Sequence, residues 1–244
     1  MENRTFLDDM KGGLFDLDGV IVDTAKYHYL AWKRLANELG FDFTEHDNER
    51  LKGVSRMESL RILLEIGGVE AAEDARAMMA ARKNAWYVEY ISKMDANEIL
   101  PGAREYLMAL RSRGVKIALG SASKNAPMIL DNLGITPLFD AIVDGNKVSH
   151  AKPDPEVFLI GARELGLDVG DCVVFEDAAA GVEAAHRGGM RAVGIGTREA
   201  LPDADIVVGS GRSPLISSNT VPLGPRWPGS FLYRLPQESD RKSS

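Results

Sequence analysis

Short apolar runs separated by helical segments fill the second half of the chain and constrain its fold most. The runs span residues 115–119, 141–143, 172–175, 192–195 and 205–208. Such runs, alternating with helices, are typical of a parallel sheet that helices cover on both faces. An earlier apolar run with Leu14, Phe15, Val20 and Ile21 adds a first strand near the N-terminus. The sequence therefore predicts an α/β fold with a doubly wound parallel sheet, similar to the Rossmann fold.

Residues 24 to 96, which separate the first strand from the others, show only helical patterns. Apolar residues recur at helical spacing between Ala25 and Leu39. Two capping boxes, beginning at Thr44 and Ser55, mark further helix starts. We therefore expect an α-helical cap domain of residues 24–96, inserted on two linkers into a core formed by residues 10–23 and 97–208.

The two ends of the chain fall outside this pattern. Residues 1–9 precede the first strand, and we expect them to form an extension outside the fold. Residues 209–244 contain five prolines and many Ser and Gly residues, with no helical or alternating period. We expect an irregular tail here, where a closing helix over the sheet would normally follow.

Charge and composition exclude several classes of partner. A formal net charge of −7 over 244 residues argues against nucleic acids and anionic membranes, which both require a basic surface. No apolar stretch reaches the roughly 18 residues that span a bilayer. The single cysteine, Cys172, excludes an internal disulfide and fits a reducing compartment. We expect a cytoplasmic monomer without nucleic-acid or membrane partners.

Two acidic residues, Asp16 and Asp18, lie in the first apolar run, directly before Gly19. Side chains two residues apart on a strand share a face, so both carboxylates are expected to point the same way. Adjacent like charges raise each other's pKa, so the pair requires either a bound cation or one protonated acid. For this motif alone, a solvated turn after the strand is the ordinary alternative.

Polar residues also follow the later strands, and ligands of doubly wound sheets bind at the carboxyl ends of strands. These residues are the Ser121–Asn125 segment, Lys152 with Pro153, and Glu176 with Asp177. Carboxylates suit Mg²⁺, whereas hydroxyl and ammonium groups neutralise a phosphoryl group. Each feature alone has an ordinary explanation, such as a helix cap or a surface lysine. Together they predict phosphoryl transfer.

In order and composition, these segments resemble the four motifs of the haloacid dehalogenase superfamily across roughly residues 10–208. The resemblance implies that Asp16 is the nucleophile and forms an aspartyl-phosphate. It implies that Asp18 is the general acid and base, and that Ser121 and Lys152 orient and neutralise the phosphoryl group.

The same resemblance implies a Mg²⁺ ion as cofactor. The implied ligands are Asp16, the backbone carbonyl of Asp18, and Asp177. Glu176 is implied to lie in or next to the coordination shell.

Within the superfamily, residues 51–56 (LKGVSR), 82–84 (RKN) and 121–125 (SASKN) resemble the β-phosphoglucomutase family. This resemblance implies an enzyme that interconverts β-D-glucose 1-phosphate and β-D-glucose 6-phosphate through an aspartyl-phosphate and a glucose 1,6-bisphosphate. The implied substrate-binding residues are Asp18, Gly53, Val54, Ser55, Arg56, Lys83, Ser123, Lys124 and Asn125. Arg56 would clamp the non-reacting phosphate, because a guanidinium binds phosphate in a bidentate manner.

Thr24 and His28, near the first linker, match family positions that couple cap closure to the chemistry. For His28 the alternative is ordinary packing, because it lies on the apolar face of its helix. For Lys83 the alternative is a solvated charge on a helix surface.

A sugar-phosphate phosphatase of the same superfamily is the alternative, since it would share the core motifs and use water as the acceptor. An EF-hand is excluded because Val20 and Tyr27 occupy positions where its loop needs ligands. A dinucleotide-binding enzyme fits poorly because no glycine-rich fingerprint follows the first strand.

Overall fold

The computed structural model describes residues 6–51 and 55–209 of the chain. The six strands in these ranges are β1 (Gly12–Phe15), β2 (Lys116–Gly120), β3 (Ala141–Val143), β4 (Cys172–Glu176), β5 (Arg191–Ile195) and β6 (Ile206–Val208). The helices are α1 (Phe6–Asp9), α2 (Ala25–Glu38), α3 (Glu45–Glu49), α4 (Arg56–Gly67), α5 (Glu73–Ile91), α6 (Ala103–Ser112), α7 (Ala126–Asn132), α8 (Glu156–Leu165) and α9 (Ala179–Arg187). Three 3₁₀ turns complete them: η1 (Ala96–Glu98), η2 (Thr136–Leu138) and η3 (Val169–Asp171).

All six strands form one sheet in the order β3-β2-β1-β4-β5-β6, and every pairing is parallel. The predicted doubly wound sheet is therefore confirmed. β1 lies at the centre, where Phe15 is in register with Leu119 on one side and Phe175 on the other. The strand order reverses its direction beside β1, and the carboxyl ends of strands at such a point form the ligand crevice of open α/β sheets.

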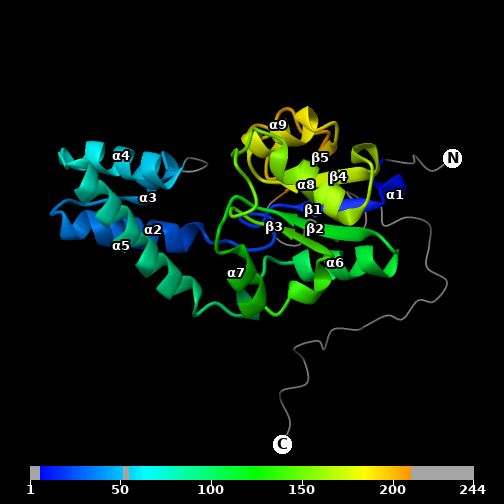
Figure 1. Cartoon of the computed structure of the whole chain (residues 1–244), viewed down its shortest axis with the longest axis horizontal. Coiled ribbons are helices and arrows are strands. Elements are labelled where there is room, and N and C mark those ends of the chain that lie inside the picture. The colour runs from blue at the N-terminus through cyan, green and yellow to red at the C-terminus, as the bar shows by residue number, and fades with distance from the viewer. Residues whose placement is uncertain (1–5, 52–54, 210–244) are drawn as a thin grey trace, which may run out of the picture.

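Two hydrophobic clusters cover the two faces of the sheet. Phe15 stacks on Phe175 with 4.4 Å between ring centroids, on the face that packs against α6 and α7. Leu14 points to the opposite face and packs with residues of α8 and α9. Figure 1 shows these helix pairs as layers on either side of the strands. Burial on both faces explains why the strands are continuous apolar runs.

The first helix corrects one expectation from the sequence. Residues 1–9 were expected to lie outside the fold, but Phe6–Asp9 form α1, and Leu7 is only 1% exposed within the cluster that covers the sheet. Residues 1–5 lie outside the described ranges. So do residues 210–244, which make up nearly all of the expected tail.

Helices α2 to α5 lie to one side of the sheet, as Figure 1 shows, and have a hydrophobic cluster of their own. The Thr44 capping box is present, and the Ser55 hydroxyl accepts the Glu58 N–H at the start of α4. The end of α5 is different, because Tyr87 and Ile91 pack in the same cluster as the sheet residues. Among the described helices, none combines the length and apolar character needed to cross a bilayer.

Candidate active site

The turn after β1 carries the two aspartates. β1 ends at Phe15, so Asp16 and Asp18 come directly after the strand, at its carboxyl end, as the sequence predicted. The Asp16 N–H still donates to Phe175 O at 3.0 Å, which fixes this residue at the end of the sheet. Gly19 then turns the chain at a φ of +77°, a conformation that strongly favours glycine. The buried strand therefore delivers Asp16 directly into the ligand crevice.

Lys152 joins the ends of three strands. Its ammonium donates to Asp16 Oδ1 and Glu176 Oε1, both at 2.5 Å, and to the Gly120 carbonyl oxygen at 3.1 Å. The Glu176 side chain is only 1% exposed, so this is a buried ion pair with two acids. Burial alone would lower the pKa of Lys152, but the two carboxylates hold that pKa above its usual range. Lys152 therefore stays charged at the point where a phosphoryl group would sit on Asp16.

Glu176 has no free carboxylate oxygen in this arrangement. Besides the contact with Lys152, its Oε2 accepts the Ala178 N–H at 3.0 Å. Burial raises the pKa of Glu176, and the adjacent ammonium of Lys152 opposes that rise. These contacts fit a residue that orients Lys152.

Asp18 lies in a polar contact with the start of α2. The Thr24 hydroxyl donates a short hydrogen bond to Asp18 Oδ1, and Thr24 is itself buried. Removal from water raises the pKa of Asp18 to about 7, and the negative charge of Asp16 adds to this effect. A carboxyl group with such a pKa can both give and take a proton near neutral pH.

Asp177 lies close enough to Asp16 and Asp18 for their charges to act on it, and carboxylate oxygens are the donors that a hard divalent cation prefers. The pKa of Asp177 is raised to about 8, first by withdrawal from water and then by repulsion from Glu176, Asp16 and Asp18, although the side chain keeps an exposed surface. A Cβ added at Gly19 would lie only 2.0 Å from Asp177 Oδ2, so the glycine leaves room for this carboxylate beside the turn. A bound Mg²⁺ would relieve the repulsion between these acids.

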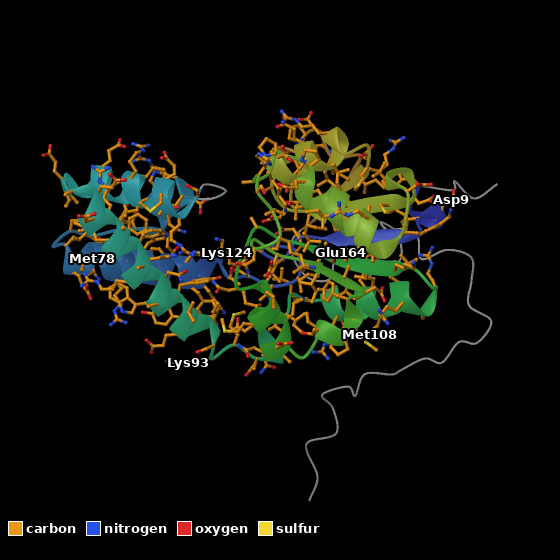
Figure 2. All side chains as sticks on the ribbon, viewed as in Figure 1. Asp9, Met78, Lys93, Met108, Lys124 and Glu164 are labelled. Carbon is orange, nitrogen blue, oxygen red and sulfur yellow. The ribbon has the colours of Figure 1, made fainter. Side chains whose placement is uncertain are left out.

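The segment after β2 lies at the same edge. Ser121 is 1% exposed, and its hydroxyl oxygen accepts the Ser123 N–H at 3.1 Å. The Ser123 hydroxyl oxygen in turn accepts the Asn125 N–H at 3.3 Å. Lys124 is exposed, and Figure 2 shows it at the end of the sheet domain that faces the helical insertion.

The predicted cap residues gather at a second place, on α2, α4 and α5. Lys83 is 2% exposed, so the alternative of a solvated helix charge is wrong. Its ammonium donates to His28 Nδ1 at 2.9 Å and lies over the rings of Trp32 and Tyr87. Burial and then the charge of Arg56 lower the pKa of Lys83 to about 7. An anion close to Lys83 and Arg56 would therefore be favoured.

His28 stacks on Tyr87 with 4.0 Å between ring centroids, so it is packed as well as hydrogen-bonded. Burial, followed by the charges of Lys83 and Arg56, lowers the pKa of His28 to about 3. A neutral imidazole nitrogen can accept a hydrogen bond from the Lys83 ammonium, which links α2 to α5. Ser55 and Arg56 are exposed at the start of α4, whereas Gly53 and Val54 lie outside the described residues.

Comparison with known families agrees with this geometry. Residues 10–189 match the haloacid dehalogenase-like hydrolase family. The chain belongs to this family.

Individual members of the haloacid dehalogenase-like family resemble the chain over most of its length. It is 45% identical to the "Beta-phosphoglucomutase" of Bacillus subtilis, over 82% of this chain and 89% of that protein. It is 30% identical to the "Phosphorylated carbohydrates phosphatase" of Thermotoga maritima, over 87% of this chain and 96% of that protein. A crystal structure of β-phosphoglucomutase from Clostridium difficile superposes with a TM-score of 0.76 at 43% identity, covering 85% and 93% of the two chains.

The structure places at the site two groups that the sequence did not predict. The Gly120 carbonyl holds Lys152, and Tyr87 supports both His28 and Lys83. A backbone carbonyl leaves no mark in the sequence. Tyr87 follows Lys83 by one helical turn, so the 3.6-residue period could have identified it as a neighbour.

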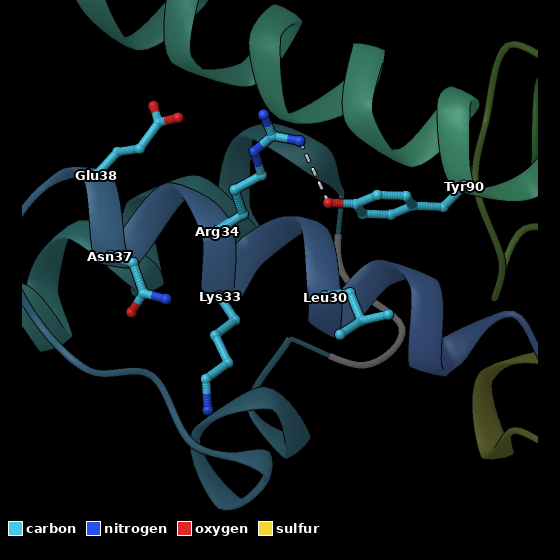
Figure 3. Close-up of a pocket in the computed structure, with 6 residues that line it drawn as sticks. All are labelled: Leu30, Lys33, Arg34, Asn37, Glu38 and Tyr90. Carbon is cyan, nitrogen blue, oxygen red and sulfur yellow. Dashed lines mark hydrogen bonds between the residues drawn. The ribbon is translucent and has the colours of Figure 1, made fainter.

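Two other features lie apart from this site. A groove of about 490 Å³ on the outer surface of α2 and α5 contains none of the predicted residues; it is drawn in Figure 3 and is lined by Leu30, Lys33, Arg34, Asn37, Glu38 and Tyr90. In the segment that leads into α8, the ligand atoms of His150, Asp154 and Glu156 lie within 4.8 Å of one another. Hydrogen bonds within that loop, such as His150 N–H to Glu156 Oε2 at 2.7 Å, account for their arrangement.

Gly181→Ala is expected to lower turnover about tenfold, which corresponds to the loss of one hydrogen bond to a charged group. A Cβ at Gly181 would lie 2.0 Å from the Glu176 carboxyl group, which would have to leave Lys152 or the Ala178 N–H. Steady-state kinetics would measure the effect. Gly170→Ala is the matched control, because a Cβ at Gly170 meets no atom within 4 Å. Equal kinetics for the two variants would contradict the role given to Glu176.

Proposed function

We propose that the protein is a β-phosphoglucomutase, which interconverts β-D-glucose 1-phosphate and β-D-glucose 6-phosphate. The observation that carries phosphoryl transfer is the Lys152 ammonium, 2.5 Å from both Asp16 and Glu176 at the strand ends. The choice of a mutase is supported by the 45% identity with a relative of that name. A sugar-phosphate phosphatase is the second candidate, since a relative with 30% identity is named as one.

In the proposed reaction, the phosphoryl group passes through Asp16. The sugar's 6-hydroxyl attacks phosphorus of the phosphorylated Asp16 while Asp18 takes the hydroxyl proton, which gives a sugar bisphosphate and a free Asp16 carboxylate. After the bisphosphate turns over, Asp16 attacks the 1-phosphate, and Asp18 returns the proton to the leaving oxygen. Ser121 and Lys152 orient and neutralise the phosphoryl oxygens in both steps.

Mg²⁺ is the proposed cofactor, held by Asp16, the Asp18 carbonyl and Asp177. When bound, the ion stabilises negative charge on the phosphoryl oxygens. Glu176 would lie in or next to this shell, and its Oε1 also orients Lys152.

We propose that residues 24–96 act as a cap over a core of residues 10–23 and 97–208. Arg56, with Gly53, Val54 and Ser55, would bind the phosphate that does not react. Lys83 would support Arg56 as a second cation. From the core, Ser123, Lys124 and Asn125 would contact the substrate, while Thr24 and His28 couple cap closure to Asp18. We further propose that the protein acts as a monomer in the cytoplasm.

The decisive assay uses β-glucose 1-phosphate, Mg²⁺ and a trace of β-glucose 1,6-bisphosphate. Formation of glucose 6-phosphate supports the mutase. Release of inorganic phosphate alone supports the phosphatase and would overturn the proposal.

Arg56→Ala is expected to reduce glucose 6-phosphate formation on the order of 100-fold, since it removes a bidentate contact with the distal phosphate. Hydrolysis of a small phosphate ester, which has no second phosphate, should stay close to normal. Arg61→Ala is the matched control, because Arg61 lies on the same helix and pairs with Glu58 and Glu65. Equal losses with both substrates would count against the assignment of Arg56.

A further inference from the structure

The two linkers between the helical insertion and the sheet contact each other directly. Val22 of the first linker forms an antiparallel bridge with Ile99 of the second. The Leu100 N–H also donates to Ile21 O at 2.9 Å. The two linker segments thus form a short hinge in which they are hydrogen-bonded side by side.

Glu98 joins the second linker to the first turn of α2, at the base of the helical insertion. Its Oε1 accepts the Tyr27 hydroxyl at 2.7 Å, and its Oε2 accepts the Lys26 ammonium. Lys26 and Tyr27 belong to the first turn of α2, whereas Glu98 ends η1. The contacts with Lys26 and then Tyr27 lower the pKa of Glu98, so it accepts both bonds as a carboxylate at neutral pH.

The two bonds to Glu98 differ in their surroundings. The Lys26 side chain is 49% exposed, so solvent screens its attraction to the carboxylate. Tyr27 is half-buried and packs against the cluster that covers the sheet. A hydrogen bond to a charged acceptor in such a place is stronger than a neutral one. The Tyr27 contact is therefore the more important of the two.

The same turn of α2 carries groups of the site. The Tyr27 N–H donates to Thr24 O at 3.0 Å, and the Thr24 hydroxyl donates to Asp18. The next residue, His28, contacts Lys83. A contact that fixes Tyr27 therefore also fixes the segment that lies between Asp18 and the cap.

We propose that Glu98 is a positioning residue that makes the cap turn on both linkers as one body and so limits hydrolysis of phosphorylated Asp16. This inference rests on the proposed mutase function. Glu98 falls just past the boundary set at residue 96, but it precedes the hinge residue Ile99, and Tyr27 follows the hinge residue Val22. Their contact therefore lies on the cap side of the bridge and moves with the cap as it closes. Without the contact between Glu98 and Tyr27, the two linkers twist separately, and water reaches the phosphorylated Asp16. Water then attacks phosphorus, the bond to the Asp16 oxygen breaks, and inorganic phosphate leaves.

The test measures the ratio of inorganic phosphate to glucose 6-phosphate formed by the full chain in one reaction. Tyr27→Phe should raise this ratio about tenfold, as expected for the loss of a hydrogen bond to a charged group. Glu98→Gln keeps an acceptor for the Tyr27 hydroxyl and should raise the ratio much less. Tyr29→Phe is the matched control, because its hydroxyl contacts Phe43 O and Lys33 within the helical insertion.

Hydrogen exchange at the Leu100 amide provides a readout that does not depend on activity. Faster exchange in Tyr27→Phe, but not in Tyr29→Phe, would support the contact between the linkers. An unchanged ratio with unchanged exchange would overturn the proposal, as would a lower ratio, because the contact would then hold the cap open. If the wild type forms no glucose 6-phosphate, the mutase function fails, and the exchange rates still decide whether Glu98 joins the linkers.

Discussion

Replacing Lys152 with Met is expected to lower turnover severely and to destabilise the fold at neutral pH. Met keeps most of the side-chain length but removes the cation between Asp16 and Glu176, which leaves two buried acids facing each other. Removing one partner of a buried ion pair costs about 3–5 kcal/mol of unfolding free energy. Loss of a group that stabilises charge on the phosphoryl oxygens costs about 100- to 1,000-fold in kcat. Kinetics and urea unfolding would measure the two effects.

The loss of stability in Lys152→Met should depend on pH in a defined direction. Burial already raises the pKa of Glu176, and without the ammonium that pKa rises further. The folded variant then binds a proton more tightly than the unfolded chain, so its stability increases as pH falls toward 5. Lys147→Met is the matched control, since Lys147 pairs with Glu164 on the surface. A Lys152→Met protein as stable and active as this control would contradict the role of Lys152.

The sheet could be predicted from the sequence because parallel strands buried on both faces are written as continuous apolar runs. Strand ends are then also visible, and the carboxyl ends of parallel strands meet at one edge. That reasoning alone brings Asp16, Ser121, Lys152 and Glu176 together before any coordinates are known.

The remaining features depend on contacts between distant segments. Lys83 has the sequence spacing of a surface charge on a helix. It is buried because the rings of Trp32 and Tyr87, together with His28, enclose it, and these contacts cannot be predicted from helix spacing. α1 has four residues, too few to show a helical period, so the burial of Leu7 could not be predicted.

Glu176 and Asp177 illustrate the same limit at the site itself. They are adjacent acidic residues, and nothing in the sequence indicates that their contacts differ. Glu176 is the last residue of β4, and its side chain is fully buried against Lys152. Asp177 lies beyond the strand, beside Gly19. The end of β4 therefore decides which acid contacts the lysine and which lies beside Gly19.

Asp18→Asn is expected to reduce glucose 6-phosphate formation about 100- to 10,000-fold, the usual contribution of a general acid and base. The amide oxygen can still accept the Thr24 hydroxyl, so the turn keeps its shape while the group loses its ability to carry a proton. Acetyl phosphate has a leaving group that needs no proton, so it should still phosphorylate Asp16 in the variant. Acid-quenched samples would then show phosphorylated protein that fails to pass its phosphoryl group to the sugar. Normal glucose 6-phosphate formation would show that Asp18 does not carry the proton. Loss of phosphorylation by acetyl phosphate would show that the side chain serves the attack of Asp16 itself rather than proton transfer alone.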